Sequence, residues 1–355
     1  MIFPWQQEQW QLIWRRYYAQ RLPHALLFVG ASGIGKNKFA GEFARALLCE
    51  KKSSVKDFAR DNFSSSTICA CHACHACHAC HLVSKKVHPN LLIIEPEKED
   101  GAIKIDQIRE ITEFVNQSSL QGYERIIVIH HADQMNLAAA NALLKTLEEP
   151  TSGAFLILVS DQCDRLPATI RSRCQRIIFS SPPFSSALLW LKNELVDKKL
   201  DAELLLNIAQ GAPLNALKMA DESLLTLRKN VHQGLIIRDD PIKLAAQFLE
   251  SPSLIMIDFI MCFINDLLRF KLYRLENLPA PQFKKFVINH DLIDKLGVLS
   301  TKIQLKSIIN FLIFLQEIRK KISLGLNLNK QLMIESLFIK WHAFDLKDHL
   351  QDGLF

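Results

Sequence analysis

Residues 30–37 are Gly30-Ala31-Ser32-Gly33-Ile34-Gly35-Lys36-Asn37, a glycine-rich loop. An apolar run at 25–29 precedes it, and an alanine-rich helical pattern follows it to about residue 48. This is the context of a phosphate-binding P-loop, in which backbone N–H groups and a helix N-terminus face the phosphates. The glycines and Lys36 fit the G-x-x-x-x-G-K pattern, but Asn37 replaces the Ser or Thr that binds Mg²⁺. The alternative is an ordinary strand-to-helix turn with an exposed lysine.

Further apolar runs predict a parallel sheet around this loop. They lie at 91–94, 125–129, 155–160 and 177–179, and helical patterns separate them. Continuous apolar strands are typical of parallel sheets that are covered on both faces, so residues 1–180 are predicted to form an α/β domain.

Two histidines, His130 and His131, directly follow the apolar run at 125–129. An ATPase needs carboxylates at this place, one to hold Mg²⁺ and one to position the attacking water. The histidines are either a metal-binding pair or two ordinary polar residues at a strand end. In neither case do they supply the acidic groups that ATP hydrolysis needs.

The cysteines predict a metal site. Five of the nine cysteines lie within residues 69–80, where Cys-His-Ala repeats in tandem. Two thiolates at C-x-x-C spacing can share one tetrahedral Zn²⁺, and closed four-ligand sites are structural. The preferred ligand set is Cys49, Cys74, Cys77 and Cys80. A frame that uses Cys71, a histidine in place of a cysteine, or a repeat that binds nothing are the alternatives.

Composition and the C-terminal half complete the predicted organisation. The 355 residues are 49% hydrophobic and 23% charged, with a net charge of +6, as in ordinary globular proteins. Neither a signal peptide nor an uncharged apolar run of membrane-spanning length is present, so we expect a cytoplasmic protein. Ser181-Pro182-Pro183 marks a boundary, followed by a small helical domain at 181–222 and a larger helical domain at 223–355.

Motifs from most of the chain resemble one family. They are His24-Ala25-Leu26-Leu27, the cysteine set with His88-Pro89, Asn141–Pro150, Ser172-Arg173-Cys174 and Gly211–Leu217. With them the chain resembles the clamp-loader subunits of bacterial DNA polymerase III, and among these the delta prime family. The resemblance implies an AAA+ P-loop domain with a zinc-binding insertion at about 49–88, a helical lid, and a helical collar for oligomerisation.

The resemblance also implies partners and a place in replication. Members of the family join motor subunits (gamma or tau) and a delta subunit in a hetero-pentameric ring. That ring loads the sliding clamp on primed DNA, so contact with clamp and DNA comes through the complex and no membrane is involved. The chain would thus be a subunit of a DNA-directed DNA polymerase holoenzyme, a nucleotidyltransferase, and not catalytic alone.

Residue roles follow from the same resemblance. Arg173, with Ser172 beside it, matches the motif that presents an arginine finger to ATP bound by the neighbouring subunit. Asn37, His130, His131 and Leu214 depart from the motor subunits, since Leu214 replaces a nucleotide-sensing arginine of the lid. These departures predict a subunit that does not hydrolyse ATP, although the retained Lys36 and glycines still allow nucleotide to bind.

The family also bears on the metal ligands. The spacing from Cys80 to His88-Pro89 fits the family and selects the frame of Cys74, Cys77 and Cys80. Cys69 and Cys71 then belong to an expanded repeat, and Cys49 lies farther from this run than the family spacing.

Two competing functions remain open at this level. One is an ATP-hydrolysing motor subunit, favoured by Gly35 and Lys36 and opposed by the two histidines and Leu214. The other is a metal-binding or metal-buffering protein that uses the Cys-His repeat.

Overall fold

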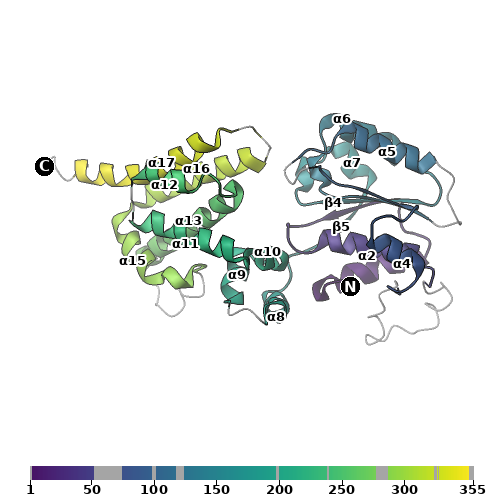
Figure 1. Ribbon diagram of the computed structural model, residues 1–355, viewed down its shortest axis with the longest axis horizontal. Helices are drawn as coiled ribbons and strands as arrows, with labels where there is room; N and C mark the ends of the chain where they lie inside the picture. Colours follow the sequence, from purple (N-terminus) through teal and green to yellow (C-terminus); the bar gives the residue numbers. More distant parts are fainter. Residues whose placement is uncertain are drawn as a thin grey trace. The chain divides into compact units, whose positions relative to one another are not determined.

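The protein is described by a computed structural model that covers most of its chain (Figure 1). The residues described are 2–51, 74–97, 101–116, 124–196, 200–237, 240–276, 287–323, 326 and 328–351. Cys69 and Cys71 of the tandem repeat therefore lie outside the described residues. Among the described helices, no single one is long and apolar enough to cross a membrane. The two helical segments 290–302 and 305–322 meet the length and composition criteria only when taken together, and the chain bends by 114° between them.

The chain forms two compact units, Met1–Ala187 and Leu188–Phe355. The first unit agrees with the predicted α/β domain, and the second is helical. The finer division into a lid at 181–222 and a collar at 223–355 stays a prediction. α8 (Phe184–Glu194) runs across the boundary between the two units.

The first unit is built on a five-stranded parallel sheet with the strand order β2-β3-β4-β1-β5. All five predicted strands are confirmed. The strands are β1 (Ala25–Val29), β2 (Leu91–Ile94), β3 (Arg125–Ile129), β4 (Ala154–Ser160) and β5 (Gln175–Ile178).

Side chains alternate between the two faces of this sheet, and each face has its own layer of helices. Ala25 and Leu27 of β1 belong to one apolar cluster with residues of α5, α6 and α7. Phe28 points to the other face, where its ring packs against Phe39 of α2, 5.4 Å between centroids. The helices of this unit are α1 (Gln7–Tyr18), α2 (Lys36–Leu48), α4 (His78–Ser84), α5 (Ile105–Asn116), α6 (Leu137–Glu148) and α7 (Ala168–Arg173).

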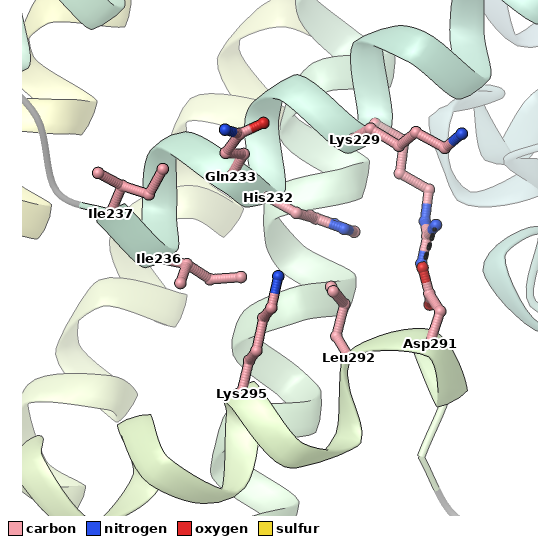
Figure 2. Close-up of a pocket in the computed structure, with 9 residues that line it drawn as sticks. Lys229, His232, Gln233, Ile236, Ile237, Asp291, Leu292 and Lys295 are labelled. Carbon is pink, nitrogen blue, oxygen red and sulfur yellow. Dashed lines mark hydrogen bonds and ion pairs between the residues drawn. The ribbon is translucent and has the colours of Figure 1, made fainter.

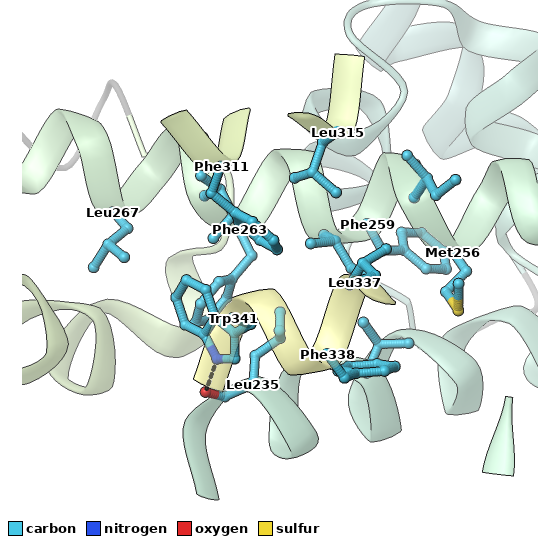
Figure 3. Close-up of a cluster of buried hydrophobic side chains, with 14 of the residues drawn as sticks. Leu235, Met256, Phe259, Phe263, Leu267, Phe311, Leu315, Leu337, Phe338 and Trp341 are labelled. Carbon is cyan, nitrogen blue, oxygen red and sulfur yellow. Dashed lines mark hydrogen bonds between the residues drawn. The ribbon is translucent and has the colours of Figure 1, made fainter. Parts of the chain in front are cut away.

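The second unit packs around α13 (Ser253–Glu276), whose buried face carries Phe259, Phe263 and Leu267 (Figure 3). Trp341 is fully buried against this face, and its indole N–H donates to the carbonyl oxygen of Leu235 at 3.0 Å. The other helices are α9 (Ala202–Ile208), α10 (Pro213–Met219), α11 (Glu222–Ile237), α12 (Pro241–Gln247), α15 (Ile293–Lys302), α16 (Leu305–Ser323) and α17 (Lys330–Gln351).

Candidate functional site

The glycine loop lies between the C-terminal end of β1 and the start of α2, as the sequence predicts. Gly33 and Gly35 have φ angles of +76° and +96°, which side-chain-bearing residues rarely adopt. A Cβ atom on Gly30 would clash with the carbonyl oxygen of Phe179, so the chain can only pass here without a side chain. The backbone of the loop therefore requires or strongly favours glycine at positions 30, 33 and 35.

Lys36, the lysine of the loop, is buried and fully hydrogen-bonded. Its ammonium group donates to the carbonyl oxygens of Gly30 (2.8 Å) and Ala31 (2.6 Å). A third bond, also a salt bridge, joins it to Asp161 Oδ1 at 2.6 Å. A lysine ammonium has three N–H donors, and these three acceptors engage all of them. A phosphate group could bind Lys36 only by displacing one of these partners.

Asp161 was not among the predicted site residues. It is the first residue after β4, next to β1 in the sheet, so its carboxylate lies at the same edge as the loop. Its backbone N–H donates to Asp133 Oδ1 at 3.0 Å, which fixes the turn. A polar residue directly after a buried apolar run was the signal in the sequence that could have found it.

Asn37 and the two histidines meet at this edge, as their positions predict. The Nδ1 atom of His130 lies 3.1 Å from Asn37 Oδ1. Burial lowers the pKa of His130 to about 4, so its ring is neutral near pH 7 and is assigned as donating Nδ1–H to Asn37. His131 lies 4.0 Å from Asp161 Oδ2. Within the described residues, neither histidine belongs to a group of side chains placed to hold a metal ion.

The N-terminal segment closes over the loop from another side. The indole N–H of Trp5 and the side-chain amide of Gln6 both donate to the carbonyl oxygen of Ile34, at 3.0 and 3.1 Å. Phe3 is buried beside Gly35 and stacks on Trp5, with 4.9 Å between ring centroids. Trp5 lies in a short 3₁₀ turn, Pro4–Gln6, that directly precedes α1. These contacts fix the loop from outside its own sequence.

Ser172 and Arg173 lie at the end of α7, immediately before β5, and both are exposed. One guanidinium nitrogen of Arg173 lies 2.7 Å from Glu148 Oε1, and another donates to the carbonyl oxygen of Thr169 at 3.1 Å. The Ser172 hydroxyl also donates to the Thr169 carbonyl, at 3.0 Å. Arg173 is therefore a surface cation, and both residues that it contacts, Glu148 and Thr169, are exposed to solvent.

Arg173 and the glycine loop lie at opposite ends of the strands of the sheet. β1 and β5 are parallel, and Leu26 pairs with Gln175 while Val29 pairs with Ile178. The loop follows the end of β1, whereas Arg173 precedes the start of β5. The five residues of β1 alone span about 16 Å. Arg173 is thus placed away from the loop of its own chain.

Leu214, the other predicted departure, lies in α10 and is partly buried. It belongs to the second compact unit, and the loop belongs to the first. That Leu214 replaces a nucleotide-sensing arginine therefore stays a prediction.

The four preferred cysteines come together in a separate cluster. The sulfur atoms of Cys49, Cys74, Cys77 and Cys80 all lie within 4.8 Å of one another, and Cys49 and Cys77 are 3.9 Å apart. Four thiolates around one tetrahedral Zn²⁺ have sulfur atoms about 3.8 Å apart. Cys49 caps the C-terminal end of α2, and Cys77 caps the N-terminal end of α4. The donor set and its spacing therefore fit a closed zinc site.

Backbone N–H groups also point at these sulfur atoms. The N–H groups of Cys74, Cys77 and Cys80 donate to the sulfurs of Cys49 (3.3 Å), Cys74 (3.2 Å) and Cys77 (3.4 Å), respectively. Hydrogen bonds, first among them that from the N–H of Ala76, lower the pKa of Cys74 to about 6. Such bonds stabilise thiolate, the form that binds a metal.

A charged network attaches the cysteine cluster to the helix of the glycine loop. His75 lies between Cys74 and Cys77 in the sequence, and its Nε2 is 3.4 Å from Glu42 Oε2 on α2. The Arg45 guanidinium contacts both Glu42 and His75. The cluster and its surroundings thus tie the Cys-rich segment to α2.

Comparison with known proteins gives consistent similarities. Residues 5–183 match the family described as DNA polymerase III, delta subunit, and residues 222–343 match its C-terminal counterpart. The chain is 31% identical to DNA polymerase III subunit delta' of Pseudomonas aeruginosa, over 96% of this chain and 97% of that protein. It is 29% identical to the Escherichia coli subunit delta', over 66% and 65%. A gamma subunit-related protein of Thermotoga maritima aligns over 96% of this chain and 99% of its own, with 19% identity and a TM-score of 0.40.

Proposed function

This chain belongs to the delta prime family of DNA polymerase III subunits, and we propose that it is a non-hydrolysing member of the clamp-loader ring. In this role it presents Arg173 to ATP that a neighbouring motor subunit holds. Its ring partners are gamma or tau subunits and a delta subunit, and the assembled ring acts on the sliding clamp and primed DNA in the cytoplasm. Its own glycine loop has a structural role and does not hydrolyse ATP.

The observation that carries this proposal is the separation of the two candidate sites on one sheet. Arg173 precedes β5, while the glycine loop follows the parallel strand β1. An arginine at the opposite edge is suited to a nucleotide in another subunit. There its charge would offset the negative charge that develops on the transferred phosphoryl group.

The glycine loop supports the non-hydrolysing part of the proposal. Asn37 bonds to a neutral His130 where a motor subunit needs a Mg²⁺ ligand beside a carboxylate. Asp161, the carboxylate that lies here, is committed to Lys36. Lys36 is thus held by three protein acceptors, and Asn37 stands where a motor subunit carries the hydroxyl ligand of Mg²⁺.

We also propose that Cys49, Cys74, Cys77 and Cys80 hold one structural Zn²⁺. When bound, the metal would cross-link the end of α2 to the start of α4. The four cysteine sulfur atoms would take all four positions of a tetrahedral ion, so no open position would be left for a substrate. The expected zinc content is one ion per chain, whereas a metal-buffering protein would bind several.

The chain alone should show no ATP turnover. We expect that mixing the purified protein with ATP and Mg²⁺ releases no phosphate above the background of buffer, and that Lys36→Ala behaves identically. The reason is that Asn37, His130 and His131 stand where a motor subunit carries the hydroxyl ligand of Mg²⁺ and two carboxylates. Phosphate release measured continuously, with a motor subunit as the positive control, checks this. Turnover by the chain alone that disappears in Lys36→Ala would instead identify it as a motor subunit.

A further inference from the structure

The glycine loop keeps backbone donors that the rest of the chain does not use. Within the described residues, the N–H groups of Gly33 and Gly35 donate to no other backbone group. Both glycines have positive φ angles, and the first N–H groups of α2, which begins at Lys36, have no partner within the helix. Unpaired N–H groups in a turn before a helix N-terminus are the donors with which proteins hold phosphate. The loop thus retains donors for an anion.

Asp161 brings a carboxylate of the same chain to this loop. It follows β4, the neighbour of β1 in the sheet, and its Oδ1 atom lies 2.6 Å from the Lys36 ammonium. The Lys36 side chain is 3% exposed and the Asp161 side chain is 25% exposed, so solvent ions screen their attraction only weakly. The positive charge that a phosphate would need is therefore already balanced from within the chain.

The position of the Asp161 carboxylate is fixed by its surroundings. The backbone N–H of Asp161 donates to Asp133 Oδ1 at 3.0 Å, and His131 Nδ1 lies 4.0 Å from Asp161 Oδ2. A group that is held in place by the fold loses little freedom when it binds Lys36, whereas a free phosphate loses its translational and rotational freedom. The tethered carboxylate also acts at a high effective concentration. It therefore competes strongly with any anion from solution.

From this arrangement we propose that Asp161 is an autoinhibitory counter-ion, which keeps a latent polyphosphate site in the glycine loop closed. The carboxylate binds Lys36 in place of a phosphate group and repels a second anion at the same ammonium. This inference rests on the proposed function, in which the loop has no turnover, and adds the residue that keeps phosphate out. Neutralising Asp161 should open the loop to a triphosphate chain, free or in a nucleotide, without creating an ATPase.

The test uses the full chain labelled with ¹⁵N-glycine and titrates tripolyphosphate and ATP in buffer without Mg²⁺. The chain has 12 glycines, so the backbone signals of Gly33 and Gly35 can be followed among few others. In the wild-type chain we expect no saturable shift of either signal. In Asp161→Asn both signals should shift, with an affinity at least about tenfold above the wild-type limit, because the repulsion is gone and Lys36 can form a charge-assisted bond to phosphate.

Further variants identify the groups responsible. Asp161→Ala, which removes the acceptor as well as the charge, should bind tripolyphosphate at least as tightly as Asp161→Asn. The double variant Lys36→Ala, Asp161→Ala should lose this gain, because the ammonium is missing. Asp164→Asn is the matched control, since Asp164 is an exposed aspartate three positions farther along the chain, and it should behave like the wild type. Unchanged signals of Gly153 and Gly211 without ligand show that folding is intact.

Equal affinities of Asp161→Asn for tripolyphosphate and ATP would show that the triphosphate chain alone is bound, and a tighter Kd for ATP would add a contact with the nucleoside. Wild-type binding as tight as that of Asp161→Asn, no gain in either Asp161 variant, an equal gain in Asp164→Asn, or a gain that survives the loss of Lys36 would each overturn the proposal. None of these results bears on Arg173, whose role is measured by hydrolysis in the assembled complex. Conversely, ATP hydrolysis by the wild-type chain alone would contradict the proposed function, whatever the Asp161 variants bind.

Discussion

Arg173→Ala is expected to slow ATP hydrolysis by about 10³-fold or more at the one ATP site that this chain faces in a reconstituted clamp-loader complex. The cause is the loss of the guanidinium that offsets charge on the phosphoryl group in transit. In the proposed ring, other subunits would serve the remaining ATP sites, so steady-state turnover alone would understate the change. A rapid-quench experiment with clamp and primed DNA should show one ATP fewer consumed per complex in the first round.

Folding should not change in this variant. Arg173 and its partner Glu148 are both accessible, and exposed ion pairs contribute only about 0.2–1 kcal/mol to stability. Size-exclusion chromatography should therefore show normal assembly of the complex. If the variant complex hydrolyses ATP in the first round with wild-type amplitude and rate, Arg173 is not an arginine finger.

Two further variants test whether the effect depends on the position of Arg173 and on its guanidinium group, or only on positive surface charge. Arg171→Ala is the matched control, since Arg171 lies on the same helix α7 and pairs with Asp164 at 3.3 Å. It should leave the first round intact. Arg173→Lys keeps the charge but not the planar fork of donors, so it should restore only a small part of the activity. Full rescue by lysine would point to general surface charge and against a geometrically specific finger.

Loss of one cysteine of the cluster is the second change with a large expected effect. Cys74→Ser should release the bound zinc and lower the free energy of unfolding by about 3–4 kcal/mol, as expected for a ligand that was present at 100 to 1,000 times its Kd. Cys74 is the best position because it is only partly buried, so the serine costs little packing. Metal analysis and denaturant unfolding of the variant measure the two effects.

The control for this variant is Cys163→Ser, which removes a partly buried thiol outside the cluster. It should keep one zinc per chain and change stability little. Removing zinc from the wild-type chain with a chelator should reproduce the effect of Cys74→Ser and should not destabilise that variant further. Wild-type protein that contains no zinc, or a stability that chelation leaves unchanged, would contradict the structural zinc site.

The fold was predictable because its signals are local. Each of the five strands is a short apolar run, and the glycine loop identifies β1 as the strand that leads into the candidate site. The cysteine set was also within reach, since C-x-x-C spacing restricts the geometry of the ligands. Cys49 entered the set as the distant fourth cysteine, although 24 residues separate it from Cys74.

The contacts that decide the state of the loop could not be predicted in the same way. The bond from Lys36 to Asp161 joins residues 125 positions apart and depends on β1 and β4 being neighbours. Strand order is not encoded in any single strand. The same is true of Trp5 and Gln6, whose polar atoms reach Ile34 only because the N-terminal turn folds back on the loop. Arg228 of α11 likewise pairs with Asp291 (Figure 2) and Asn289, about 60 residues away, which helical periodicity does not show.

The central claim is that this chain serves the ATP of another subunit and not its own. The most direct test compares Lys36→Ala and Arg173→Ala side by side in the reconstituted complex with clamp and primed DNA. We expect wild-type ATP hydrolysis and clamp loading with Lys36→Ala, whereas Arg173→Ala should hydrolyse one ATP fewer per complex in the first round and load the clamp more slowly. The reverse pattern, loss with Lys36→Ala and normal activity with Arg173→Ala, would contradict it.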